Sequence, residues 1–133
     1  MFENGKDAAR IGLTAHTAVL HRLVSKGLEV LQPLGDYRRY DLAYYDKTST
    51  ELIRVQCKAG HYDSNTGRVV FKNFNRSGGR GEKRGYVGDA EYFGVYCAEL
   101  NKVYLIPVDI VTYTSGVGLY LKIRPVCFSM HTI

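Results

Sequence analysis

The 133-residue sequence predicts an α/β fold in which a mixed central β-sheet is flanked by helices. Three observations predict it. A long N-terminal segment has apolar residues at helical spacing, several later segments alternate apolar with polar residues, and one segment is apolar almost throughout. A chain of one helix followed by several strands usually lays the helix across one face of the sheet. The length suits one hydrophobic core, so we expect a single domain over residues 1–133.

The helix is expected over Ala8–Lys26. Its apolar residues recur every three or four positions, at Ile11, Ala15, Ala18, Val19 and Leu23. Gly27 follows at the position where a glycine commonly ends a helix. The sequence shows no second long helix, although Asp109–Tyr113 is suited to a short one.

The strands are expected in the rest of the chain, each indicated by alternation or by an apolar run. Four come first in the chain: Leu28–Leu31, Tyr40–Tyr45, Glu51–Ala59 and Val69–Phe74. Tyr92–Cys97 is apolar almost throughout, which predicts a central strand buried on both faces, and Val103–Ile106 returns from it. Alternation over Val117–Arg124 predicts an edge strand.

Cysteine usage and hydropathy indicate a cytoplasmic protein. The sequence has three cysteines, Cys57, Cys97 and Cys127. Their odd number, their wide spacing and their position in apolar strand patterns predict buried, reduced thiols. No apolar run is long enough for a transmembrane helix, and the charged N-terminus lacks the apolar core of a secretory signal. We therefore expect no membrane partner.

Positive charge is concentrated in one glycine-rich segment. The net charge is +5, and six basic residues accompany a single acid between residues 68 and 84. A flexible basic loop suits DNA, whose charged backbone must be followed closely. Four residues are therefore expected to bind DNA: Arg76, Arg80, Lys83 and Arg84. The alternative is a solvated, mobile loop, since basic runs are common on protein surfaces.

Three polar residues on two neighbouring strands form the candidate catalytic site. Alternation in the strand Glu51–Ala59 places Gln56 and Lys58 on the face opposite its apolar residues. If the preceding strand pairs with it through a turn, Asp41 meets both. Asp41 and Gln56 would offer oxygen ligands to a divalent metal, and Lys58 would hold a phosphate or orient water. The alternative is a turn-capping Asp41 beside two exposed residues, because the pattern is short and degenerate.

Six stretches carry a resemblance to a known family. They are Ile11–Thr14, Gly27–Val30, Tyr40–Leu42, Val55–Lys58, Tyr92–Cys97 and Val103–Pro107. In this order they resemble the PD-(D/E)XK nuclease superfamily, most closely the group I intron-encoded homing endonucleases and more distantly the archaeal Holliday junction resolvases. The intron-encoded branch has Q-x-K in place of E-x-K, which matches Gln56 and Lys58.

The resemblance implies a restriction-endonuclease-like core, with a four-stranded mixed sheet flanked by helices. It also implies Mg²⁺-dependent phosphodiester hydrolysis, with Mn²⁺ as a substitute, and assembly into dimers or tetramers. One position departs from the family, which commonly places a Glu on the first helix, facing the metal. That position falls at or near His16, which is then either a substitute contact to phosphate or water, or an ordinary helix histidine. Four acids could replace the Glu: Glu3, Asp7, Glu29 and Asp36.

The leading hypothesis is a Mg²⁺-dependent DNA endonuclease. It would cleave either duplex DNA, as homing endonucleases do, or branched DNA, as Holliday junction resolvases do. The missing helix Glu favours an alternative, a non-catalytic DNA-binding module that keeps the nuclease fold. A plain interaction domain is a third hypothesis, supported only by the tyrosine and apolar content.

Overall fold

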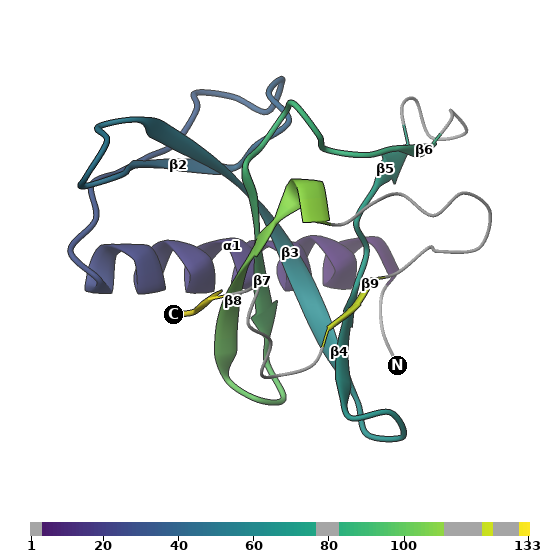
Figure 1. Ribbon diagram of the computed structural model, residues 1–133. Coiled ribbons are helices and arrows are strands. Elements are labelled where there is room, and N and C mark those ends of the chain that lie inside the picture. The colour runs from purple at the N-terminus through teal and green to yellow at the C-terminus, as the bar shows by residue number, and fades with distance from the viewer. Residues whose placement is uncertain (1–3, 77–82, 111–120, 124–130) are drawn as a thin grey trace.

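The chain lays one long helix across one face of a β-sheet (Figure 1). The structure is a computed structural model that describes residues 4–76, 83–110, 121–123 and 131–133. The helix is α1 (Asn4–Ser25), and the strands are β1 (Val30–Leu31), β2 (Leu42–Tyr45), β3 (Leu52–Asp63), β4 (Arg68–Phe71), β5 (Asn75–Arg76), β6 (Lys83–Arg84), β7 (Tyr92–Cys97), β8 (Lys102–Pro107), β9 (Leu121–Ile123) and β10 (His131–Thr132). A 3₁₀ turn, Val108–Ile110, follows β8.

The main sheet is mixed, as predicted. Its strands lie in the order β1-β2-β3-β7-β8-β10, and β4 and β9 continue it from β3. β3 and β7 run parallel, whereas every other described pair is antiparallel. β7 lies between β3 and β8, which confirms the predicted central strand. The predicted α/β fold is confirmed, with one flanking α-helix in the described residues.

The helix begins four residues before its predicted start and ends one residue before its predicted end. Gly27 has a φ of +79°, and its amide donates to the carbonyl of Val24 at 2.9 Å. The amide of Leu28 donates to the carbonyl of Leu23 at 3.2 Å. Because a left-handed φ costs glycine little, Gly27 ends the helix as the sequence predicts.

Apolar side chains cover both faces of the sheet. On the α1 face, Val19 and Leu23 belong to a buried cluster with Leu42 and Val55. A second buried cluster includes Phe71, Tyr86, Phe93, Val95 and Tyr104. Successive residues of a strand point to opposite faces, so Val55 faces α1 and Gln56 faces away from it.

Most of the predicted strands are present with shifted bounds. β3 runs on to Asp63, past its predicted end, because its far half pairs with β4. The glycine-rich segment, expected as an open loop, forms a short hairpin of β5 and β6 at its described ends. β10, which the sequence patterns did not indicate, pairs with β8.

Two predictions are only partly covered by the described residues. The edge strand expected at Val117–Arg124 is present as β9, which pairs with β4, while residues 117–120 and 124 lie outside the described part. The helix expected at Asp109–Tyr113 is the 3₁₀ turn Val108–Ile110, and residues 111–113 also lie outside it.

The described cysteines are buried thiols, as predicted. Cys57 and Cys97 are both free, and burial raises the pKa of each thiol. Cys127 lies outside the described residues. In the part of the chain that the structure describes, no helix is long and apolar enough to span a membrane.

Gly94 allows α1 to approach β7 closely. A Cβ atom at Gly94 would lie 2.8 Å from Val19 Cγ1 and 3.0 Å from Val55 Cγ1, and both β-branched side chains are stiff. We expect Gly94→Ala to lower the free energy of unfolding by about 1–3 kcal/mol, measured by urea denaturation. The control is Gly12→Ala within α1, where a Cβ meets no atom within 4 Å and should stabilise the helix. An unchanged midpoint for Gly94→Ala would contradict this close packing.

Candidate active site

The pairing of β2 with β3 brings Asp41 opposite Gln56. The register pairs Leu42 with Val55, and the Asp41 amide donates to the Val55 carbonyl at 2.9 Å. Asp41 precedes Leu42 and Gln56 follows Val55, so the two residues lie opposite each other. Because Leu42 and Val55 face α1, Asp41 and Gln56 both lie on the face away from α1. The hairpin that the sequence predicts between these strands is therefore present.

A backbone hydrogen bond fixes the Asp41 carboxylate. Its Oδ2 accepts from the Cys57 amide at 2.9 Å. Within the described residues, neither the second oxygen, Oδ1, nor the side-chain amide of Gln56 has a hydrogen-bond partner. Two oxygen atoms on neighbouring strands are thus available to a ligand.

Lys58 lies two residues beyond Gln56, on the same face of β3. Burial lowers the pKa of its ammonium group from 10.5 to about 8, and the charge of Asp41 opposes part of that shift. Asp41 lies opposite Gln56 in the β2–β3 register, and Lys58 is the next residue of β3 on that face. The structure therefore brings together all three residues of the predicted catalytic site.

The residues that cover Lys58 were missed by sequence reasoning. Tyr86 lies in the turn before β7, and its hydroxyl accepts from Lys58 Nζ at 3.1 Å. The guanidinium carbon of Arg39 lies 4.3 Å from the centroid of the same ring. Arg39 also donates to Asp89 Oδ2 and to the Gly85 carbonyl, each at 2.6 Å. The sequence offers only a tyrosine in a glycine-containing turn, which is not a specific signal.

A second ion pair joins β3 to the start of β7. Arg54 Nη2 donates to Glu91 Oε1 at 2.6 Å, and the Arg54 amide donates to Oε2 at the same distance. The hydrogen bond from the Arg54 side chain lowers the pKa of the Glu91 carboxyl. Both oxygens of Glu91 are engaged, so this acid supports the strand that carries Gln56 and Lys58.

His16 does not join this group. It lies on α1, which packs against the opposite face of the sheet, and its Nε2 is 2.8 Å from Gln32 Oε1. In the described part of the chain, no hydrogen bond links His16 to the three predicted catalytic residues.

The predicted DNA-binding residues lie on the β5–β6 hairpin or just beyond the described residues. Arg76 pairs with Lys83, and Asn75 pairs with Arg84, in the antiparallel register of the two strands. Arg80 lies outside the described part. The hairpin projects from the sheet at the end away from the β2–β3 turn (Figure 1).

A hollow at the start of β7 is separate from the three predicted catalytic residues. It has a volume of about 580 Å³, and its walls include Arg54, Glu91 and Asp109. None of the three residues contributes to its wall.

Comparison with known proteins relates this arrangement to a family. A family model described as PD-(D/E)XK endonuclease matches residues 6–128. The chain belongs to the PD-(D/E)XK endonuclease family.

This endonuclease is similar in structure to the bacterial homing endonuclease I-Ssp6803I. The TM-score is 0.70 at 29% identity, over 89% of this chain and 78% of that one. A search of curated proteins gives no match. The predicted superfamily and its homing-endonuclease-like branch are therefore confirmed.

PD-(D/E)XK nucleases typically use divalent metal ions, and the donors on this face suit a hard cation. Asp41 and Gln56 offer carboxylate and amide oxygens, which are ligands that Mg²⁺ accepts. The set is small, because no group of three or more His, Cys, Asp or Glu in the described residues could hold a metal ion.

Lys58→Met tests the buried charge, in the absence of metal and DNA. Between about pH 8 and 10.5 the unfolded chain keeps a proton at Lys58 that the folded chain releases, so wild-type stability rises with pH across this window. Below pH 8 the variant should be more stable by about 3 kcal/mol in urea unfolding. Above pH 10.5 the difference in stability between Lys58→Met and wild type should become smaller.

The control is Lys47→Met, because Lys47 is exposed. The difference in stability between Lys47→Met and wild type should not change with pH. If Lys58→Met and wild type were equally stable both below pH 8 and above pH 10.5, the Lys58 charge would not be buried.

Proposed function

We propose that this PD-(D/E)XK endonuclease is a Mg²⁺-dependent DNA endonuclease that hydrolyses phosphodiester bonds at a duplex site. The observation that carries the proposal is the convergence of Asp41, Gln56 and Lys58 on one sheet face. The structural similarity to a homing endonuclease favours a duplex substrate over a branched one. Mn²⁺ is expected to replace Mg²⁺, since both prefer oxygen ligands.

Each residue has a distinct part in the proposed reaction. Asp41 and Gln56 would hold the cation, with the carboxylate fixed by the Cys57 amide. When bound, the cation lowers the pKa of a water molecule and polarises the scissile phosphate. Lys58 places its positive charge against the phosphate oxygens, where negative charge increases in the transition state. Because the ammonium is partly buried, solvent screens this attraction less than at an exposed lysine.

We also propose that the protein acts as a homo-oligomer, a dimer or a tetramer. The support for this is the resemblance to the intron-encoded homing endonucleases, which implies assembly into dimers or tetramers. We place the activity in the cytoplasm, where reducing conditions keep Cys57 and Cys97 as thiols. Among the described residues, no cluster of three or more acidic, His or Cys side chains could hold a metal, which favours a second candidate, a DNA-binding module that retains the fold without catalysis.

A cleavage assay separates these functions. A library of duplex fragments, single-stranded DNA and a four-way junction are each incubated with the protein in Mg²⁺, Mn²⁺ or EDTA. Metal-dependent cleavage of duplexes at one recurring sequence supports the proposal. Symmetric nicks across the junction would identify a resolvase, and binding without cleavage in either metal would identify the non-catalytic module.

Asp41→Asn should reduce cleavage by at least about 10²–10³-fold, the cost of losing one preorganised charge. Asparagine keeps an oxygen that accepts from the Cys57 amide, so the fold and the DNA affinity should be preserved. Asp46→Asn is the matched control, since Asp46 holds the β2–β3 turn through Thr48 and Ser49. Rates are measured in single turnover at saturating protein. Wild-type turnover by Asp41→Asn would exclude Asp41 as a metal ligand.

Replacing Arg76, Arg80, Lys83 and Arg84 together by glutamine should weaken DNA binding and leave the cleavage step of bound DNA unchanged. Each ion pair with a DNA phosphate that the substitutions remove should reduce the slope of log K against log salt by about 0.9 on duplex DNA. The control replaces four exposed basic residues elsewhere, Arg10, Lys26, Lys47 and Lys102. Affinity is measured over a salt titration. Equal slopes for the two quadruple variants would remove the hairpin from the DNA interface.

A further inference from the structure

A catalytic lysine needs a partner that fixes its position. The ammonium group sits at the end of a flexible four-carbon chain and lacks the rigid geometry of a guanidinium. In the described residues, the hydrogen bond of Lys58 Nζ is to the Tyr86 hydroxyl, at 3.1 Å. The same Nζ lies 4.7 Å from the centroid of the Tyr86 ring. Tyr86 thus contacts the ammonium through both its hydroxyl and its ring.

Tyr86 is itself held on several sides. It is only 3% exposed, and its ring meets Phe93 edge-to-face with centroids 5.6 Å apart. Arg39 lies over the ring, and the Tyr86 carbonyl accepts from the amides of Asp89 and Ala90 at 2.9 and 3.2 Å. A hydroxyl on a ring packed in this way is a rigid hydrogen-bond acceptor.

We propose that Tyr86 is a positioning residue whose hydroxyl holds the Lys58 ammonium in the orientation that DNA cleavage requires. This inference rests on the proposed function. Tyr86 acts through Lys58, because fixed charges stabilise a transition state only when they are already correctly placed. Packing accounts for a buried aromatic ring at this position, whereas the hydroxyl makes hydrogen bonds with the side chains of Lys58 and Arg39.

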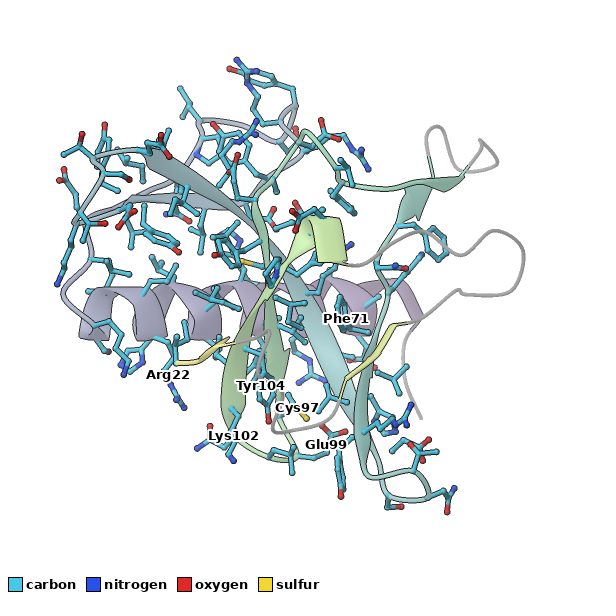
Figure 2. All side chains as sticks on the ribbon, viewed as in Figure 1. Arg22, Phe71, Cys97, Glu99, Lys102 and Tyr104 are labelled. Carbon is cyan, nitrogen blue, oxygen red and sulfur yellow. The ribbon has the colours of Figure 1, made fainter. Side chains whose placement is uncertain are left out.

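Tyr104 provides a matched comparison. Both tyrosines belong to the same buried cluster. Figure 2 shows Tyr104 near Cys97 and Glu99, toward the end of β7 opposite the turn that holds Tyr86. The Tyr104 hydroxyl is buried and has no hydrogen-bond partner in the described part of the chain. A Tyr-to-Phe change therefore removes a partnered hydroxyl at position 86 and an unpartnered one at position 104.

Kinetics test the role of the hydroxyl. Tyr86→Phe should slow single-turnover cleavage about tenfold, as expected for one well-placed hydrogen bond, with DNA affinity changed less than about twofold. In a Lys58→Ala background the same change should have less than about a twofold effect, because the two residues act as one unit. Tyr104→Phe should cleave at the wild-type rate. Equal losses in both backgrounds, or no loss in the wild-type background, would overturn the proposal.

A second measurement does not depend on activity. With ¹³C at lysine Cε, the Lys58 methylene signal is identified by its absence in Lys58→Ala. In wild type and in Tyr104→Phe, the hydroxyl of Tyr86 holds the end of the Lys58 side chain in one orientation, so the two Cε protons should have different chemical shifts. In Tyr86→Phe that hydroxyl is lost, the side chain is free to rotate, and the two shifts should become equal. An unchanged signal in Tyr86→Phe would overturn the positioning role even if the protein cleaves DNA. A merged signal in a protein that cleaves no DNA would support the contact and reject the endonuclease function.

Discussion

The register of β2 against β3 is the constraint on which the site depends. Two hydrogen bonds of Asp41 support it, one from its amide to the Val55 carbonyl and one from the Cys57 amide to its carboxylate. A slip of one residue would turn Gln56 and Lys58 into the core against α1. The alternation of β3 resists that slip because it would bury two polar side chains without partners. Asp41, the proposed metal ligand, therefore also holds the register that keeps Gln56 and Lys58 on the face away from α1.

The parallel neighbour of β3 completes the site from the other side. Arg54 and Glu91 join β3 to the start of β7, and the turn that carries Tyr86 comes directly before it. The Tyr86 ring packs on Phe93 of β7, which pairs with Gln56 across the sheet. The turn before β7, held by this packing, thus places Tyr86 against the Lys58 ammonium, whose burial lowers its pKa to about 8. The charged groups come from β3 and the chain before β2, whereas the aromatic cover comes from Tyr86 in the turn before β7 and from Phe93 of β7.

The features that could be predicted from the sequence were those set by local residue patterns or by the resemblance to a family. Tyr92–Cys97 matches β7 at both ends, because a strand buried on both faces is apolar from end to end. The meeting of Asp41 with Gln56 and Lys58 needed only an alternating strand and a hairpin turn. The cover by Tyr86 could not be predicted, because it joins positions 28 residues apart by a contact that leaves no periodic signal. β10 and the β5–β6 hairpin have two-residue strands, which are too short to show a period.

The small set of ligands has an electrostatic consequence for the proposed mechanism. One carboxylate and one neutral amide leave a divalent cation short of negative charge, and the nearby Lys58 and Arg39 further weaken its binding. A DNA phosphate would supply both the missing charge and additional oxygen ligands. Metal and DNA binding are then coupled, and the coupling is reciprocal, because each must raise the affinity for the other by the same factor. If Asp41 is the only carboxylate ligand, as among the described residues, the endonuclease would bind its cation tightly only when DNA lies on the sheet, so the complete site would form on the substrate.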